Sequence, residues 1–370
     1  MSHATTLPAQ ATIDWIEVSA YRIPTDAAES DGTYEWNSTT LVVVEAHGGD
    51  ECGLGYTYAD AATAQVVQEK LADVVAGLDA FDVPLAWQRM VQSIRNLGRP
   101  GVASMAIAAI DGALWDLKAK LLGLPLVSLL GAARDCAPVY GSGGFTSYSL
   151  EKLQEQLGGW AAQGIRHVKM KIGRDASADR QRVAVAREAI GPDVELFVDA
   201  NGAYSRKQAL AQAESFAEQG VCWFEEPVSS DDLAGLRLLR DRAPPGMEIA
   251  AGEYGYDLVY FRRMLEAGAV DVLQIDATRA AGITGFLQAA ALAAAFGLEV
   301  SAHCAPSLHA HPCCAIANVR PLEYFHDHVR IEQMLFDGAL APAAGALRPD
   351  RSRPGMGLEF KRADAERYAI

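Results

Sequence analysis

The sequence contains no apolar run long enough to form a membrane-spanning helix. Its most apolar helical stretch, residues 288–298, has about half of the roughly 20 residues that a bilayer span requires. Cysteine is sparse, with six in 370 residues and no CxxC pair, which excludes a small scaffold held by disulfides. Positive charge is in deficit, because 32 Lys and Arg against 47 Asp and Glu leave a net charge of −15. We therefore expect no basic surface for nucleic acid or for a membrane.

The N-terminal segment has little basic character. Residues 1–15 lack a basic region followed by an apolar run, so we expect no secretory signal peptide. Together with the scattered cysteines, this favours a cytoplasmic protein with reduced thiols. The remaining composition, 50% hydrophobic and 21% charged, is that of a globular chain with ample length to bury a core.

The first part of the chain has the pattern of an α+β domain. Three apolar, β-branched segments predict a small antiparallel sheet, at residues 13–23, 39–45 and 54–57. The polar, turn-rich segment 25–36 lies between the first two and is expected to be a loop. Helical patterns follow at residues 62–76, 85–96 and 102–122. We place this domain at residues 1–125.

From residue 137, short strand patterns alternate with amphipathic helices. Eight strands are predicted, at residues 138–141, 167–172, 195–199, 222–225, 248–252, 270–275, 299–302 and 322–325. Eight βα steps at this spacing predict a (β/α)8 TIM barrel over residues 126–337, although spacing alone leaves an open doubly wound sheet as an alternative. Residues 338–370 are expected to return to the first domain.

Ionisable residues recur at the carboxyl ends of these strands. The set consists of Lys169 and Lys171, Asp199, Glu225, Glu253, Asp276, His303 and Glu323. In a barrel these ends form the catalytic face, so residues from seven consecutive strands converge there. A lone Asp after a strand is usually a helix cap or a turn residue, but that explanation does not account for seven in register.

Three of these residues are carboxylates from successive strands. Asp199, Glu225 and Glu253 would repel one another unless a cation lay between them. Carboxylate oxygens favour Mg²⁺ or Mn²⁺ over zinc, and Mg²⁺ keeps positions open for a substrate oxygen. The alternative is that Glu225 pairs with a lysine instead.

Two candidate acid/base groups remain. Lys169 and Lys171 point to the same side of an otherwise apolar strand, and the second ammonium and a nearby cation could lower the pKa of Lys171 into the range of a base. The alternative is a pair of solvated or anion-binding lysines.

The second candidate is His303, which would lie across the barrel mouth from Lys171. Asp276, at the neighbouring strand end, would fix the tautomer of its imidazole ring. Glu323, if protonated, could donate a hydrogen bond to a developing enolate oxygen.

These residues occur in a recognisable order. The motifs are Lys169-Met170-Lys171, Val198-Asp199-Ala200-Asn201, Glu225-Glu226-Pro227, Gly252-Glu253, Ile275-Asp276, Gly282-Ile283-Thr284-Gly285, Ser301-Ala302-His303 and Leu322-Glu323. The ordered set resembles the enolase superfamily, and within it the mandelate racemase subgroup, over nearly the whole chain. The muconate lactonizing and dipeptide epimerase branch carries a lysine on the sixth strand, which residues 275–279 lack.

The resemblance implies a capping domain before the barrel and a role for each strand-end residue. It implies one Mg²⁺ per subunit, replaceable by Mn²⁺, on Asp199, Glu225 and Glu253. Lys171 (with Lys169 beside it) and His303 (oriented by Asp276) would be the acid/base groups, Glu323 the electrophilic residue and Asn201 a substrate contact. The family also implies a homo-oligomer, with an octamer among the forms it takes.

The same resemblance implies a reaction. A proton α to a carboxylate of a small molecule is removed to give an enediolate, and loss of a β-hydroxyl as water then yields a 2-keto-3-deoxy acid. We therefore expect an acid-sugar dehydratase (a lyase acting on an aldonate or aldarate), with a racemase or epimerase of a 2-hydroxy acid as the alternative. Substrate contacts are expected in the capping segments 25–36 and 56–61, from Tyr34, Trp36 and Tyr56.

Parts of this pattern are also compatible with two other classes of protein. His303-Cys304, His309, His311 and Cys313-Cys314 could form a zinc or redox site, but their spacing matches no standard zinc motif. A barrel that binds metal without catalysis would require the complete set of strand-end residues to be idle.

Overall fold

The computed structural model describes residues 10–370. Residues 1–9, which carry most of the segment tested for a signal peptide, lie outside the described residues. Between residues 10 and 370, no helix combines the length and the apolar character that crossing a bilayer would demand.

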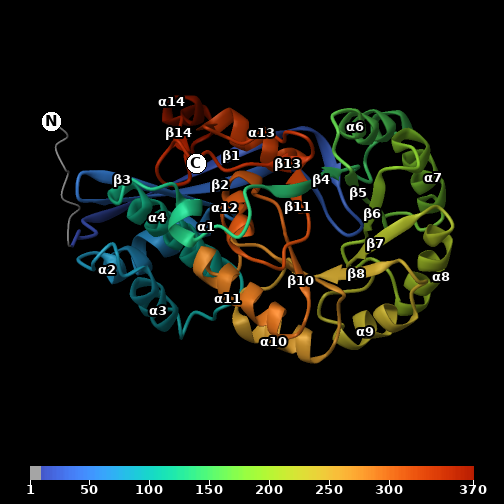
Figure 1. Cartoon of the computed structure of the whole chain (residues 1–370), viewed down its shortest axis with the longest axis horizontal. Helices are drawn as coiled ribbons and strands as arrows, with labels where there is room; N and C mark the ends of the chain where they lie inside the picture. The colour runs from blue at the N-terminus through green and yellow to red at the C-terminus, as the bar shows by residue number, and fades with distance from the viewer. Residues whose placement is uncertain (1–9) are drawn as a thin grey trace.

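The first domain is a three-stranded antiparallel sheet followed by helices (Figure 1). The strands pair in the order β1 (Trp15–Ser30), β2 (Glu35–Gly48), β3 (Glu51–Tyr58). The helical part consists of α1 (Ala62–Val66), the π-helical η1 (Val67–Leu71), α2 (Ala72–Val75), α3 (Val83–Ser93), α4 (Val102–Leu121) and α5 (Leu126–Leu130). Helix α4 is rich in Ala and Ile and mostly buried because it packs against β2 and β3 and against a barrel helix, α11 (Gly282–Ala295).

Helix α4 lies close to β3 because two glycines of that strand leave room for its backbone. A Cβ atom at Gly55 would lie 2.1 Å from the carbonyl oxygen of Ala109, and one at Gly53 would lie 2.1 Å from that of Ala113. Neither distance admits a side chain. Glycine at these two positions therefore sets the spacing between the sheet and the helix.

The polar segment 25–36, which we expected to be a loop, is instead the end of a long hairpin. Strands β1 and β2 continue into it, with a register shift between Pro24 and Glu29. The turn is closed by Asp31, whose Oδ1 accepts a hydrogen bond from the Tyr34 amide at 2.7 Å. The turn-forming residues predicted a turn correctly, but the paired backbone around it extends further than their polarity suggested.

The second domain contains the eight predicted strands, all parallel. They are β4 (Ala137–Gly143), β5 (His167–Lys171), β6 (Glu195–Asp199), β7 (Val221–Glu225), β8 (Glu248–Ala251), β9 (Val272–Ile275), β10 (Glu299–Ala302) and β11 (Leu322–Phe325). Each pairs with its sequence neighbour from β4 to β10, and β11 pairs with β4. The remaining side is bridged just before β11, where the Val300 amide donates to Asn318 O and the Arg320 amide donates to Val300 O, both at 2.7 Å. This TIM-barrel-like ring confirms the predicted fold class and excludes an open doubly wound sheet.

The barrel helices lie outside this ring (Figure 1). Besides α11 they are α6 (Leu150–Ala162), α7 (Asp179–Ile190), α8 (Arg206–Ala217), α9 (Leu233–Arg242), α10 (Leu258–Glu266), α12 (Pro306–Ala315) and α13 (His326–Leu335). Inside the barrel, Tyr140, Phe197, Trp223, Ala250 and Val272 form a separate buried cluster, in which the Phe197 and Trp223 rings stack at 4.9 Å. The polar residues of the site begin two residues further along β6 and β7, so they rest on an apolar layer.

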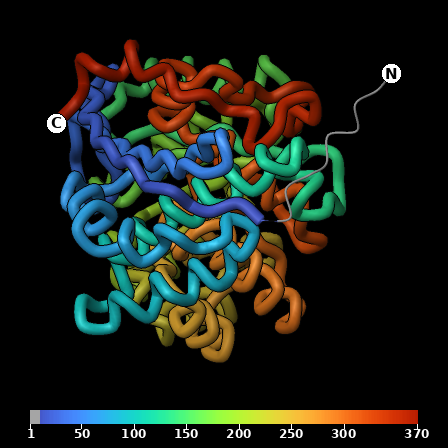
Figure 2. The backbone as a smooth tube through the Cα atoms, turned by 90° about the vertical axis from the view of Figure 1, so that its left-hand side faces the viewer, coloured from blue at the N-terminus to red at the C-terminus, as the bar shows by residue number. Residues whose placement is uncertain are grey.

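The C-terminal segment returns to the first domain, as its colour shows in Figures 1 and 2. Its elements are β12 (Phe336–Asp337), β13 (Ala346–Leu347), β14 (Glu359–Phe360), α14 (Arg362–Ala365) and η2 (Glu366–Tyr368). The Ile370 amide donates to Ala20 O of β1 at 3.1 Å, and Arg362 pairs with Glu17 at 3.1 Å. The domain boundaries at 125 and 337 stay a prediction.

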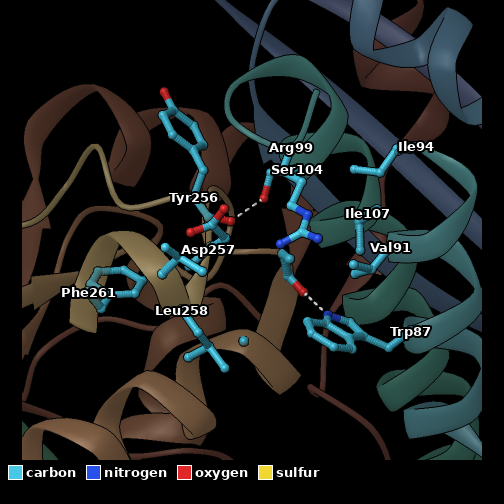
Figure 3. A pocket seen from close by; sticks show the side chains of 14 residues that line it. Trp87, Val91, Ile94, Arg99, Ser104, Ile107, Tyr256, Asp257, Leu258 and Phe261 are labelled. Carbon is cyan, nitrogen blue, oxygen red and sulfur yellow. Dashed lines mark hydrogen bonds between the residues drawn. The ribbon is translucent and has the colours of Figure 1, made fainter. Parts of the chain in front are cut away.

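The capping domain also forms hydrogen bonds to the barrel loop 276–281, which follows β9. The Trp87 indole N–H donates to Ala281 O at 2.7 Å, and the Ser104 hydroxyl lies 2.7 Å from Arg279 O. These contacts border an apolar crevice of about 150 Å³ between the two domains (Figure 3). The loop that ends strand β9 is therefore held from the capping side.

Asp111 of α4 provides a test of this junction. Its buried carboxylate accepts hydrogen bonds from Thr284 N (2.9 Å) and Thr284 Oγ1 (2.6 Å) at the start of α11, while burial raises its pKa to about 7. We expect Asp111→Ala to lower the free energy of unfolding by about 1–3 kcal/mol, because two buried donors lose their acceptor. Asp111→Asn keeps one acceptor oxygen and should cost less. Urea unfolding of both variants measures this, and equal stability of Asp111→Ala and wild type would contradict it.

Candidate active site

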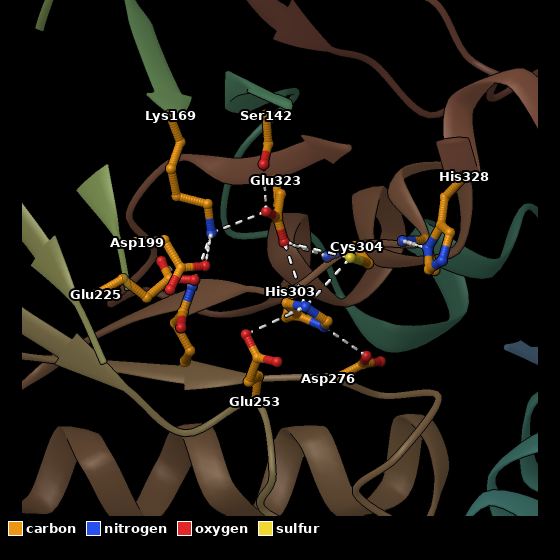
Figure 4. A network of polar contacts seen from close by, with 12 residues as sticks. Ser142, Lys169, Asp199, Glu225, Glu253, Asp276, His303, Cys304, Glu323 and His328 are labelled. Carbon is orange, nitrogen blue, oxygen red and sulfur yellow. Dashed lines mark hydrogen bonds and ion pairs between the residues drawn. The ribbon is translucent and has the colours of Figure 1, made fainter. Parts of the chain in front are cut away.

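The structure brings all of the predicted strand-end residues together at one end of the barrel (Figure 4). Strand β5 contributes two lysines and β6, β7 and β11 one carboxylate each, while the loops after β8, β9 and β10 contribute the rest. The set is Lys169, Lys171, Asp199, Glu225, Glu253, Asp276, His303 and Glu323, and every member is buried. The barrel geometry that the spacing predicted is therefore sufficient to assemble them.

Lys169 lies at the centre of an ion-pair network. Its Nζ contacts Glu225 Oε1, lies 2.8 Å from Glu323 Oε1 and 3.8 Å from Asp199 Oδ2. Burial opposes the charged form, but Glu225 and Glu323 outweigh it and hold the pKa of Lys169 well above its usual range. Glu225 therefore pairs with a lysine, but not instead of joining the triad, because one of its oxygens stays within 4.8 Å of oxygens of Asp199 and Glu253.

Lys171 contacts Asp199 Oδ2 on the neighbouring strand. Burial lowers the pKa of Lys171 and the ammonium of Lys169 lowers it further, but the carboxylates of Asp199, Glu253 and Glu323 together outweigh both. The pKa of Lys171 is therefore above its usual value. The neighbouring lysine lowers this pKa, as expected, but its effect is smaller than that of the surrounding carboxylates.

The carboxylates are more numerous than the ammonium groups. One oxygen each of Asp199, Glu225 and Glu253 lies within 4.8 Å of the others. Glu253 Oε2 and Glu226 Oε1 are buried and accept no hydrogen bond within residues 10–370. Burial and the carboxylates of Glu253 and Asp199 raise the pKa of Glu226 well above its usual range. This uncompensated set of oxygens fits a hard divalent cation.

His303 is oriented by Asp276, as predicted. Its Nδ1 lies 2.8 Å from Asp276 Oδ2, and the other carboxylate oxygen accepts hydrogen bonds from the backbone and hydroxyl of Thr278, both at 2.7 Å. Burial would raise the pKa of Asp276, but its hydrogen bond to the imidazole and the charge there hold it below its usual range. The ring therefore presents Nε2 to the site, 3.4 Å from Glu253 Oε2.

Glu323 differs from our expectation of a protonated acid. Its Oε1 accepts from the Ser142 hydroxyl (2.6 Å) besides meeting Lys169, and its Oε2 accepts from the Cys304 amide at 3.0 Å. Burial raises the pKa of Glu323, but Lys169, His303 and Lys171 outweigh it and hold the pKa well below the usual value. Glu323 is thus an anion that accepts hydrogen bonds.

Four of the strand-end residues line a cavity of about 460 Å³ beneath the capping hairpin: Lys171, Glu253, Asp276 and His303. Lys171 and His303 line it at opposite ends of the carboxylate triad, since one contacts Asp199 and the other Glu253. Asn201, Tyr34 and Trp36, predicted as substrate contacts, line it too, whereas Tyr56 does not.

Tyr56 is fully buried, and its hydroxyl donates to Glu332 Oε1 at 2.7 Å. Tyr58 takes the place expected for it, two residues further along the same face of β3, and stacks on His328 at 3.4 Å. The prediction therefore identified the face of β3 that points toward the cavity, but it chose a residue two positions away from the one that lines it.

The prediction did not assign a role to Arg279, which lines the same cavity as His328. Arg279 lies 3.4 Å from Glu253 Oε1 and 3.6 Å from Asp276 Oδ2. Its position three residues after Asp276, in a loop that must face the site, is a signal that could have identified it.

Within the histidine- and cysteine-rich stretch, His303 and Cys304 lie with Glu323 in a group that could hold a metal, whereas the other four residues belong to no such group among residues 10–370. His309 Nε2 accepts from the Ala277 amide at 2.8 Å, and His311 Nε2 meets Met356 O at 3.1 Å, so both brace backbone. Cys313 and Cys314 are buried and belong to no metal-ligating group there.

Cys304 faces the site beside His303, although adjacent residues on a strand point to opposite sides. A left-handed φ of 55° turns its Sγ to 3.3 Å from both His303 Nε2 and Glu323 Oε2. Burial and the Glu323 carboxylate raise the pKa of this thiol well above its usual value, which disfavours a thiolate.

A barrel whose strand ends carry a carboxylate triad between a lysine and an Asp-bound histidine defines an enzyme of the enolase superfamily. Residues 152–365 match the family described as enolase C-terminal domain-like, and residues 16–131 match the mandelate racemase/muconate lactonizing enzyme N-terminal domain. The chain belongs to this mandelate racemase/muconate lactonizing enzyme family, which confirms the resemblance seen in the sequence.

Three relatives illustrate the range of the family. A mandelate racemase/muconate lactonizing enzyme-like protein from Rubrobacter xylanophilus has 57% identity and a TM-score of 0.95, covering 97% of this chain and 100% of that one. A 3,6-anhydro-α-L-galactonate cycloisomerase from Streptomyces coelicolor is 33% identical, over 95% of this chain and 98% of its own. The L-talarate/galactarate dehydratase from Salmonella typhimurium, solved with magnesium and L-lyxarohydroxamate, has 28% identity and a TM-score of 0.89, covering 100% and 96%.

Glu29, which accepts a hydrogen bond from the Trp36 indole, should make the stability of the protein depend on pH. The indole donates to Glu29 Oε2 at 2.7 Å, and burial together with Asp327 raises the pKa of Glu29 from its usual 4.5 to about 8. Between pH 5 and 8 the folded protein keeps a proton that the unfolded chain has lost. Glu29 therefore lowers the free energy of unfolding as the pH rises through this window, by at most about 1.4 kcal/mol per pH unit.

Glu29→Gln keeps an acceptor for the indole and removes the ionisation. We expect its stability relative to wild type to increase steadily from pH 5 to pH 8 and then to level off. Chemical denaturation of the two proteins across this range measures the difference. Parallel stability curves would contradict the assigned titration.

Proposed function

We propose that this protein is a Mg²⁺-dependent acid-sugar dehydratase that removes the proton α to a carboxylate and expels a β-hydroxyl as water. The observation that carries the proposal is the placement of Lys171 and His303 in one cavity at the two ends of the triad of Asp199, Glu225 and Glu253. An elimination needs a base at the α carbon and an acid at the β oxygen, and this arrangement offers one group for each.

The triad is the proposed metal site. Asp199, Glu225 and Glu253 would hold Mg²⁺, with Mn²⁺ as a substitute, and the magnesium in the solved Salmonella relative supports this choice. When bound, the ion neutralises the triad and stabilises the charge that develops on the substrate carboxylate. The buried oxygen of Glu253 that accepts no hydrogen bond within residues 10–370 supports a cation there.

The chain's own residues would move the protons. With Mg²⁺ on Asp199, the carboxylate charge that raises the pKa of Lys171 would be offset, so that this lysine could act as a base. Either Lys171 or His303 would then take the α proton, depending on the configuration of that carbon, and the other would protonate the departing hydroxyl. His303 suits both tasks because Asp276 fixes Nδ1 and leaves Nε2 facing the site. The enol that remains after loss of water becomes the 2-keto-3-deoxy acid when C3 gains a proton.

Lys169 and Glu323 would act by position. Lys169 is engaged by Glu225 and Glu323, so its ammonium supplies fixed positive charge beside the triad. Glu323, as an anion, orients that ammonium and the Cys304 amide. Asn201, whose buried Oδ1 accepts no hydrogen bond within residues 10–370, together with Tyr34 and Trp36 would contact the substrate.

A cycloisomerase is the second candidate, because the Streptomyces coelicolor relative carries that name over nearly the full chain. The same elimination with a ring oxygen as the β leaving group opens a ring and releases no water. A substrate with no leaving group would instead be racemised when the opposite acid returns the proton. A homo-oligomer, with an octamer among its forms, stays a prediction.

Proton NMR in D2O with Mg²⁺ tests the reaction on aldonic acids, aldaric acids, simple 2-hydroxy acids and 3,6-anhydro-aldonic acids. A 2-keto-3-deoxy product establishes dehydration, and deuterium at the α carbon without loss of water establishes racemisation or epimerisation. Ring opening without water release establishes the cycloisomerase. No change with any acid would overturn the proposal in favour of a metal-binding protein without catalysis.

Lys171→Ala and His303→Asn should each lower kcat/KM by about 10³-fold or more, because each removes one proton-transfer group. Mg²⁺ affinity, measured by calorimetry, should change little in both. Lys207→Ala, at an exposed position of α8, is the matched control and should keep normal turnover. Near-normal turnover in either site variant would contradict the roles of these two residues.

Removal of divalent cations should abolish turnover. After dialysis against EDTA, we expect activity to return with Mg²⁺ and with Mn²⁺. Asp199→Asn should raise the Mg²⁺ concentration needed for half-maximal activity by at least about tenfold, because a neutral amide replaces a charged ligand. Full activity in the chelated protein would contradict the metal site.

A further inference from the structure

We propose that the substrate is an aldonate-type acid, with one carboxylate and a neutral chain of hydroxyls, and that a dicarboxylate with a charged far end is rejected. This inference deepens the proposed function and rests on it. It comes from the difference between the two halves of the 460 Å³ cavity. The barrel half is lined by charged or ionisable side chains of both signs, among them Lys171, Glu253 and Arg279, whereas the capping half carries no Lys or Arg of the capping domain within residues 10–370.

The capping half is lined by hydroxyl groups and two acids. Its polar residues are Asp31, Thr33, Tyr34, Ser38, Thr39, Thr40, Tyr58 and Asp60, beside the Trp36 ring. Within residues 10–370, no Lys or Arg of the capping domain lines the cavity, and residues 1–9 contain neither. A second carboxylate placed in this half would therefore meet no cation from the capping domain.

The cations nearest in the fold are engaged elsewhere. Arg279 lines the barrel half and is tied to Glu253 and Asp276. Arg330 does not line the cavity, and it pairs with Asp327 at 2.6 Å while donating to Pro24 O at 2.7 Å. Neither guanidinium is available to a group lying under the hairpin.

His328, the remaining basic side chain on the cavity wall, is a neutral donor. Its Nδ1 accepts from the Ala305 amide at 3.3 Å, so the neutral ring carries its proton on Nε2. Burial first, and then His303, lower the pKa of His328 well below its usual value. Stacked on Tyr58, this ring can donate to a hydroxyl oxygen but brings no positive charge to the capping half.

Charge then decides between the two substrate classes. A carboxylate moved from water to a partly enclosed site without a cation loses solvation, and Asp31 and Asp60 would add repulsion. Hydroxyl groups avoid both costs, because they donate to carboxylates and exchange hydrogen bonds with Ser, Thr and Tyr. Asp31 and Asp60 each use Oδ1 for backbone amides, and Oδ2 of each accepts no hydrogen bond from residues 10–370.

Matched pairs of acids test the inference with the Mg²⁺-loaded enzyme. Galactonate is compared with galactarate, and gluconate with glucarate, so that only the far end changes from CH2OH to a carboxylate. We expect kcat/KM for the accepted aldonate to exceed that of its aldarate partner by at least tenfold. An aldarate preferred or equal in every reacting pair would overturn this inference and leave dehydration intact. Failure of all these acids to lose water or exchange the α proton would overturn both.

Substitution of Ser38 tests the physical cause. Ser38→Lys brings a cation to the capping wall, and Ser38→Gln introduces a long neutral side chain as the matched control. We expect the aldarate-to-aldonate ratio of kcat/KM to rise at least tenfold in the Lys variant and to stay unchanged in the Gln variant. Asp60→Asn, which keeps an acceptor for the Ala62 amide, should raise the ratio in the same direction by removing a negative charge. Equal ratios in the Lys and Gln variants would overturn the charge argument.

Discussion

The excess of buried negative charge at the carboxyl end of the barrel is the constraint on which the rest of the structure depends. Parallel strands around a ring bring their ends together, so six carboxylates (Asp199, Glu225, Glu226, Glu253, Asp276 and Glu323) share a small space with the ammonium groups of Lys169 and Lys171. Two cations cannot balance this number. The negative charge that these two ammonium groups leave unbalanced favours a further cation at the site. It also explains why Arg279 and the Asp276-bound His303 present positive or donating groups to the acids.

The sequence was sufficient to predict the barrel and the members of this cluster, because each of them is marked locally. A strand of four or five residues ending in an ionisable side chain is visible in a short window, and the closure of the ring then places every such residue on one face. The capping hairpin was harder, since its extent depends on pairing between Glu29 and Trp36 across the turn. Tyr56 was misplaced for a related reason: alternation gives the face of β3, but only the packing of Phe336 and Glu332 determines where along that face the cavity ends.

The pKa values of Lys171 and Glu323 depend on charges that the sequence does not place. Along one strand, only the ammonium of Lys169 lies beside Lys171, where it does lower the pKa, and no partner can be assigned to Glu323. In the fold, the nearest charges come from other strands: Asp199 of β6 raises the pKa of Lys171, and Lys169 of β5 lowers that of Glu323. Coulombic partners at contact distance outweigh the desolvation that burial imposes. Sequence patterns give the inventory of charges, whereas their balance is a property of the assembled ring.

Both domains line the cavity, and the barrel loop 276–281 is the segment through which they contact each other beside it. In the function proposed above, the barrel would supply charge for one carboxylate and for proton transfer, and the capping hairpin would supply hydroxyls and acids that suit a neutral chain. Thr57 of the capping domain donates to Thr278 O at 2.8 Å, and Trp87 donates to Ala281 O, so the loop that carries Asp276 is fastened to the capping domain. A shift of the cap would therefore move the partner of His303. Substrate fit under the hairpin and orientation of the imidazole are for this reason coupled through hydrogen bonds of one short loop, which ties specificity to the alignment of the reacting groups.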